Sequence, residues 1–113
     1  MITIAKPLIT EEEMEAVKSV LMTGNIAQST KVDEFERLFA EYIGTEYAIS
    51  DSNGTTALQV ALVSNEIGKG DEVITTSFTF VATANSILFT GAKPVFVDIE
   101  YDTFNIDPSL IED

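Results

Sequence analysis

The chain has 113 residues, enough for about one domain, and 45% of them are apolar, which is sufficient for a folded core. It contains neither cysteine nor histidine, so disulfide bonds, thiolate chemistry, Ser-His-Asp triads and His-ligated zinc are excluded within these residues, and no metal site is expected. The formal net charge of −13 predicts that nucleic acids and anionic membranes are repelled.

The first ten residues lack a basic segment followed by an apolar one, and no apolar run approaches the length needed to span a bilayer. We therefore expect a cytoplasmic protein.

Two helices are predicted in the first 45 residues. Thr10 and Glu13 occupy the positions of a capping box, and the helix that they begin is expected to end at Gly24. After a loop, a second helix begins at Ser29 or Thr30, carries one apolar face at helical spacing and is expected to end at Gly44. This face consists of Val32, Phe35, Leu38, Phe39, Tyr42 and Ile43.

From residue 46 onward, short apolar strands alternate with helices. Strands are predicted at 46–50, 72–76 and 94–99, with an apolar, buried helix after residue 54 and another over 78–90. This βαβαβ order predicts an α/β fold, a mostly parallel sheet with flanking helices. Asp107 followed by Pro108 predicts the start of one more helix.

The stretch SDSNGTTALQVAL, residues 50–62, places Gly54, Thr55 and Thr56 between a predicted strand and a helix. In open α/β sheets ligands bind at such a junction, where the first helical N–H groups lack partners and the helix dipole is positive. These residues therefore form a candidate phosphate cradle that needs no lysine or arginine. The alternative is an ordinary helix cap made by Ser52 or Asn53.

Three further residues follow predicted strands. Phe78 and Phe80 lie after the second strand, where an aromatic side chain can stack on a planar ring or belong to the core. Asp98 ends the third strand, where a carboxylate can orient a ligand or cap a turn. Lys69 and Lys93 lie in turns and are expected to be exposed, unlike a desolvated catalytic lysine.

Over essentially its whole length, the chain resembles the DegT/DnrJ/EryC1/StrS family of pyridoxal-phosphate (PLP)-dependent aminotransferases, which act on nucleotide-linked keto sugars. The matching segments are FERLFAEYIGTEYAIS, SNGTTALQVAL, GKGDEVITTSFTFVATANSI and TGAKPVFVDIEYDTFNID. The NGTTAL variant looks most like members of the perosamine-synthase type.

The resemblance implies the N-terminal portion of the type I aminotransferase fold. Residues 1–45 would be a helical segment on the dimer and active-site side, and residues 46–113 would begin the large PLP-binding domain, which is truncated here. The family pattern places the PLP phosphate on Gly54, Thr55 and Thr56 and stacks Phe80 on the pyridine ring. The GNIAQST loop, residues 24–30, would bring Asn25 and Gln28 near the substrate of a homodimer.

The family's Schiff-base lysine is expected beyond Asp113, so no catalytic residue is assigned within this chain and the 113 residues alone are expected to be inactive. The parent enzyme would transfer an amino group from an amino acid, glutamate by expectation, to a nucleotide-linked keto sugar. The alternative is a non-catalytic regulatory module that binds PLP or another phosphate compound. A third hypothesis is that the chain is a folded remnant of such an enzyme that binds no ligand.

Overall fold

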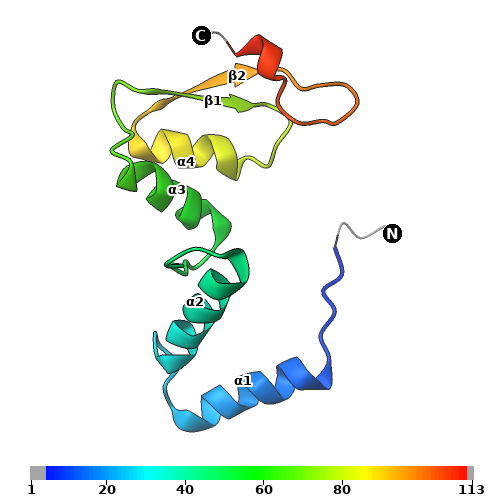
Figure 1. The fold of residues 1–113 in the computed structure, drawn as a ribbon, viewed down its shortest axis with the longest axis vertical. Helices are drawn as coiled ribbons and strands as arrows, with labels where there is room; N and C mark the ends of the chain where they lie inside the picture. Colours follow the sequence, from blue (N-terminus) through cyan, green and yellow to red (C-terminus); the bar gives the residue numbers. More distant parts are fainter. Residues whose placement is uncertain (1–4, 112–113) are drawn as a thin grey trace. The chain divides into compact units, whose positions relative to one another are not determined.

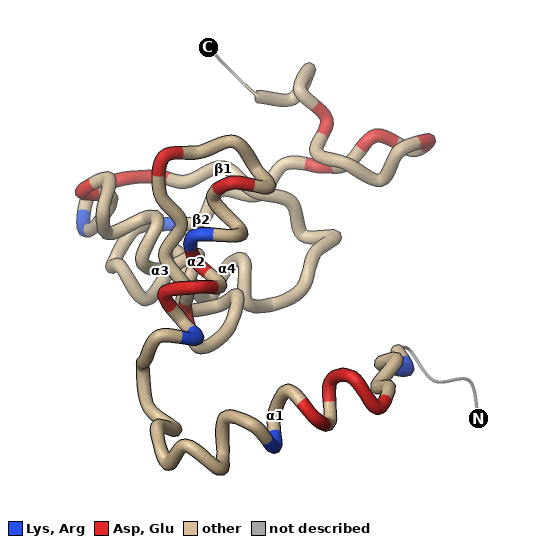
Figure 2. The backbone as a smooth tube through the Cα atoms, turned by 60° about the horizontal axis from the view of Figure 1, so that its bottom comes forward, with Lys and Arg blue, Asp and Glu red and all other residues tan. Residues whose placement is uncertain are grey.

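A computed structural model describes residues 5–111, which form two compact units, one reaching to Ile49 and the other beginning at Ser50. Acidic residues are distributed along both units and not gathered in one segment (Figure 2). None of the helices in residues 5–111 has the length and apolar character needed to cross a membrane.

The first unit contains the two predicted helices, α1 (Glu11–Thr23) and α2 (Thr30–Ile43) (Figure 1). The capping box of α1 is confirmed, because the Glu13 carboxylate accepts hydrogen bonds from the backbone N–H and the hydroxyl of Thr10. Both helices end as predicted at glycines in the left-handed conformation, with φ of 74° at Gly24 and 83° at Gly44.

The capping box gives α1 a pH dependence. The Thr10 hydroxyl and then its N–H hold the pKa of Glu13 below the ordinary value of 4.5. A lowered pKa in the folded state means that the stabilisation is present above the ordinary value and is lost as the pH falls through the lowered one.

We expect Glu13→Gln to lower the free energy of unfolding at neutral pH but not at strongly acidic pH, measured by urea titration across the pH range. Glu12→Gln is the control, since Glu12 lies in the same turn without a bond to Thr10. A Glu13→Gln deficit that persists at acidic pH would contradict the assignment.

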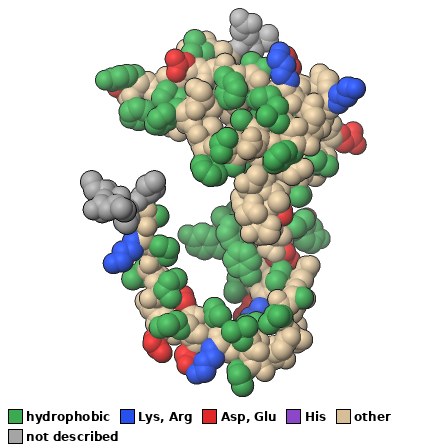
Figure 3. All heavy atoms as spheres, turned by 180° about the vertical axis from the view of Figure 1, so that it is seen from behind, with side chains coloured by type: hydrophobic (Ala, Val, Ile, Leu, Met, Phe, Trp, Pro, Cys, Tyr) green, Lys and Arg blue, Asp and Glu red, His purple; other side chains and the backbone are tan. Residues whose placement is uncertain are grey.

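The predicted apolar face of α2 is present but largely uncovered within its own unit. Ala40 is the buried residue of this helix, and the rings of Phe35 and Phe39 contact each other with centroids 5.8 Å apart. Large apolar side chains also lie at the surface of the second unit (Figure 3). Both units therefore present apolar surface of the kind that packs against other protein.

The second unit is a small α/β layer (Figure 1). Its elements in chain order are α3 (Gly54–Ser64), β1 (Glu72–Thr76), α4 (Ala82–Thr90), β2 (Lys93–Val97) and the 3₁₀ turn η1 (Pro108–Leu110). The two strands pair in parallel, from Glu72 opposite Lys93 to Thr76 opposite Val97, and α4 is the crossover helix between them. The predicted parallel α/β architecture is confirmed for this unit.

The prediction of a strand at residues 46–50 is wrong for this structure, in which the sheet has two strands, not three. Apolar and β-branched residues favour an extended chain, but a strand also needs a hydrogen-bonded neighbour. Residues 46–50 pair with no strand among the described residues, and the side chains of Tyr47 and Ile49 are exposed.

Two helix predictions need correction as well. The helix predicted over 78–90 begins only at Ala82, because side-chain oxygens bind the backbone first: the Thr76 hydroxyl accepts from the N–H of Phe78. The helix predicted after Asp107 is a single 3₁₀ turn, capped by the Asp107 carboxylate, which accepts from the N–H and the hydroxyl of Ser109. Residues 112 and 113, which belonged to that prediction, lie outside the described residues.

The core of the second unit lies where α4 meets the sheet and α3. Its buried residues are Thr75, Ala82, Ser86, Ile87 and Ala92. The expectation that α3 is a buried helix is not met, because none of its residues is buried among those described. α3 packs against α4 on one face and is otherwise open.

Candidate functional site

The first turns of α3 and α4 lie on the same side of the second unit as the carboxyl ends of β1 and β2 (Figure 1). For α4 this placement follows from topology, because a crossover helix must begin where the preceding parallel strand ends. The sequence placed its candidate residues at this edge, and the structure brings the two helix starts together there.

The turn before α3 is held by a network of side-chain hydrogen bonds. Asn53 is the N-cap, and its carbonyl side-chain oxygen accepts from the N–H of Thr56 at 3.0 Å. The Thr56 hydroxyl donates to the backbone carbonyl of Asn53 at 2.9 Å and lies 3.2 Å from the Ser52 hydroxyl, which in turn accepts from the Asn53 amide at 3.2 Å. The alternative of an ordinary helix cap is therefore correct for Asn53, and the side chains of Ser52 and Thr56 support this cap.

The cap leaves other donors of the same turn open. The N–H groups of Gly54 and Thr55 come at the first two helical positions, where no intrahelical acceptor exists. Among the bonds of the described residues, none satisfies the hydroxyl of Thr55, whose carbonyl accepts from Ser86. Capping and anion binding are thus compatible for Gly54 and Thr55, because the cap uses the two donors of Thr56 and not theirs.

Gly54 has no conformational or packing reason to be glycine in this structure. Its φ lies outside the left-handed region, and a Cβ placed on it would meet no atom within 4 Å. Glycine at the start of a helix costs stability relative to alanine. The open space beside this backbone is a feature that a bound group of matching size can use.

The two phenylalanines of the β1–α4 turn differ in their surroundings. The ring of Phe78 lies 5.6 Å from that of Phe104, with an angle of 36° between the planes. Phe80 is 77% exposed and has no ring partner among the described residues. Phe78 is also exposed, at 63%, so the core interpretation is wrong for both phenylalanines within this unit. The face of Phe80, which contacts no other ring of the described residues, is available to a planar ligand.

Asp98 caps a turn, which was the alternative to its orienting a ligand. Its carboxylate accepts from the N–H of the next residue, Ile99, at 2.8 Å, and its backbone carbonyl accepts from Asp107 at 3.0 Å. These bonds fix the chain where it leaves β2, beside the bridge of Ile99 with Ile106. Nothing in this geometry directs Asp98 toward a ligand.

The two lysines of the second unit lie at the opposite edge of the sheet. Lys93 begins β2 and forms a 2.6 Å ion pair with Glu72, the first residue of β1. Lys69 lies in the turn before β1, also at the amino end of the strands. As expected, both are exposed. Positive potential at the carboxyl edge therefore comes from the helix starts and not from cationic side chains of this unit.

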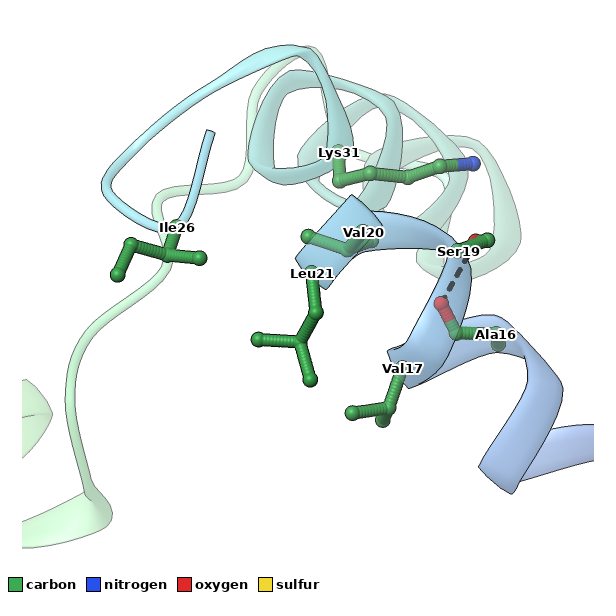
Figure 4. Close-up of a pocket in the computed structure, with 7 residues that line it drawn as sticks. All are labelled: Ala16, Val17, Ser19, Val20, Leu21, Ile26 and Lys31. Atoms are coloured by element: carbon green, nitrogen blue, oxygen red, sulfur yellow. Dashed lines mark hydrogen bonds between the residues drawn. The ribbon is translucent and has the colours of Figure 1, made fainter. Parts of the chain in front are cut away.

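Asn25 and Gln28 belong to the first unit. Asn25 lines a small cavity of about 110 Å³ with polar neighbours that include Thr23 and Thr30, whereas the side chain of Gln28 is exposed. A larger, mostly apolar groove of about 430 Å³ lies alongside (Figure 4). Its lining residues are Ala16, Val17, Ser19, Val20, Leu21, Ile26 and Lys31.

Two residues of the site escaped the sequence analysis. Ser86 is one of three polar residues in the segment ATANSILF, with Thr83 and Asn85, but this segment was taken as part of an apolar helix. Phe104, in a loop, gave no signal, and its contact with Phe78 depends on a left-handed backbone with φ of 58°.

Helices over a parallel strand pair, with open donors at the carboxyl edge, are the arrangement at which α/β proteins commonly bind ligands. Residues 7–113 match the DegT/DnrJ/EryC1/StrS aminotransferase family, and the chain belongs to it. The predicted resemblance is confirmed, and so is the fold class, the N-terminal portion of the type I aminotransferase fold.

The curated relatives include the spore coat polysaccharide biosynthesis protein SpsC of Bacillus subtilis, 46% identical over 106 residues, which are 94% of this chain and 27% of that protein. GDP-perosamine synthase of Caulobacter vibrioides is 44% identical over 112 residues, 98% of this chain and 30% of the synthase. Spr1654 of Streptococcus pneumoniae, solved in its PLP form, superimposes with a TM-score of 0.90 at 38% identity, over 96% of this chain and 28% of its own. The chain thus spans between a quarter and a third of each.

Proposed function

We propose that the protein to which this chain belongs is a PLP-dependent aminotransferase acting on a nucleotide-linked keto sugar. An amino acid, by expectation glutamate, gives up its amino group and leaves as a 2-oxo acid, and the keto carbon of the sugar receives the amine. PLP supplies the electron sink for this exchange when it is bound. The residues of this chain supply part of its binding site.

The observation that carries the proposal is the start of α3. Gly54 and Thr55 offer two backbone N–H groups and a hydroxyl at the positive end of a helix dipole, beside open space. This donor set fits a phosphate group. The relatives of known structure include a PLP form, which supports PLP as the phosphate compound.

In this proposal Gly54, Thr55 and Thr56 hold the phosphate, and Phe80 covers one face of the pyridine ring. The N–H and the hydroxyl of Thr56 both bind Asn53 in this structure and shape the turn, so in this proposal the contact of Thr56 with the phosphate replaces one of these bonds. Residues 1–45 form a helical segment on the dimer and active-site side, and residues 46–113 begin the PLP-binding domain. Asn25 and Gln28 lie near the substrate of a cytoplasmic homodimer.

The test uses the complete gene product, loaded with PLP, reduced with borohydride and digested. We expect one lysine to carry the label, at a position outside residues 1–113, and neither Lys69 nor Lys93 to be labelled, because both lie at the far edge of the sheet. In parallel, transfer of nitrogen-15 from glutamate to a panel of nucleotide-linked keto sugars is followed by mass spectrometry.

A labelled lysine together with nitrogen transfer would establish the activity. Tight PLP binding without a labelled lysine or transfer would instead favour a non-catalytic regulatory module. Absence of PLP binding would overturn the proposal altogether.

A further inference from the structure

We infer that Ser86 is a positioning residue for the phosphate-binding turn, because its buried hydroxyl on α4 holds the Thr55 carbonyl in the first turn of α3. This inference rests on the proposed function for the identity of the ligand. The hydroxyl of Ser86 lies against two backbone carbonyls, so Ser86 itself is not expected to touch the phosphate.

Ser86 is the most buried side chain of those described, with 1% of its surface exposed. Its hydroxyl lies 2.7 Å from the carbonyl of Ala82, one turn earlier in α4, and 3.1 Å from the carbonyl of Thr55. The second contact joins residues 31 positions apart in the sequence. It is a polar link between the two helices.

The Thr55 carbonyl belongs to the same peptide unit as the N–H of Thr56. The oxygen end of this peptide receives the Ser86 hydroxyl at 3.1 Å, and its N–H end donates to Asn53 at 3.0 Å. Because a peptide unit is planar, holding both ends fixes the orientation of the whole unit. The Thr55 hydroxyl and the N–H groups of Gly54 and Thr55 are attached directly before this fixed plane.

A hydroxyl carries one proton, so Ser86 shares it between two carbonyls or alternates between them. Neither carbonyl depends on it for satisfaction, because each also lies within a helix and can accept from an N–H four residues later. Removing the hydroxyl should therefore leave no buried acceptor without a partner. The loss should appear in the position of the α3 turn and not mainly in stability.

The test compares wild type, Ser86→Ala and Ser86→Cys in the complete gene product. PLP and pyridoxal, which lacks the phosphate, are titrated separately by fluorescence, and the ³¹P resonance of bound PLP is recorded. For Ser86→Ala we expect the dissociation constant of PLP to rise roughly fivefold, the value of one hydrogen bond, with a shifted ³¹P resonance. Pyridoxal binding should not change, because it does not use the turn.

Ser86→Cys keeps the size and a weaker donor, so it should fall between the other two and remains informative if Ser86→Ala fails to fold. Ser64→Ala is the matched control. Ser64 lies at the other end of α3, and its hydroxyl donates to the Ala61 carbonyl within its own helix. This control should bind PLP as the wild type does.

Unchanged PLP binding in Ser86→Ala, or an equal loss for PLP and pyridoxal, would overturn the positioning role, since the second result is what a general packing defect produces. Failure of the wild type to bind PLP would overturn the proposed function first and this inference with it. The two failures are thus distinguished by the wild-type titration.

Discussion

Replacing Gly54 with alanine is expected to weaken PLP binding on the order of thirtyfold, because an added methyl group must fit where the phosphate approaches the backbone. Stability should not fall. A Cβ at this position meets nothing within 4 Å, and the backbone is not left-handed. Alanine is also the better helix former, by up to about 1 kcal/mol. PLP titration and urea unfolding of the apoprotein measure the two effects.

Gly68→Ala provides the opposite pattern as a control. A Cβ on Gly68 would lie 3.3 Å from the Thr90 carbonyl, at the contact between the turn and the end of α4. This variant should lose some stability and keep its affinity for PLP. Wild-type PLP affinity in Gly54→Ala would show that the open space beside Gly54 is not where the phosphate binds.

The second large effect is expected from Phe80→Ala, which should raise the dissociation constant of PLP roughly tenfold through loss of ring stacking. The absorbance band of bound PLP should shift as well, since the ring environment changes. Stability should be nearly unaffected, because Phe80 is 77% exposed and contacts no other ring among the described residues.

Phe78→Ala is its matched partner, two residues away in the same turn. It removes the ring contact with Phe104, which should cost about 1 kcal/mol of unfolding free energy. PLP affinity should fall less than in Phe80→Ala. If Phe78→Ala weakened PLP binding more than Phe80→Ala did, the stacking residue would have been assigned to the wrong phenylalanine.

Local sequence signals were sufficient to predict those helices and strands whose ends are fixed by residues within the element or beside it. Thr10, Glu13, Gly24 and Gly44 define helix ends through contacts within a few residues, and each was predicted correctly. The strand at 72–76 was also correct in both of its bounds. The open donors at Gly54 follow from the same local reasoning.

The errors in the prediction occur where the local structure depends on a contact that the local sequence pattern does not show. Residues 46–50 have strand-forming side chains, but pairing depends on a neighbouring strand that local pattern does not supply. The start of α4 was placed early because Phe78 and Phe80 look like part of an apolar helix, whereas the Thr76 hydroxyl holds the chain in a turn. The link from Ser86 to Thr55 joins two helices, so no short window of sequence contains it.

The cap of α3 has a thermodynamic consequence. The bonds among Ser52, Asn53 and Thr56 lie within the turn itself, so the turn's own side chains orient the donors that follow. A preorganised turn pays little conformational entropy when an anion arrives. Binding of an anion at this turn should therefore show no heat-capacity change of the kind that accompanies coupled folding. Inorganic phosphate alone should bind to the turn in the same geometry as the phosphate group of PLP.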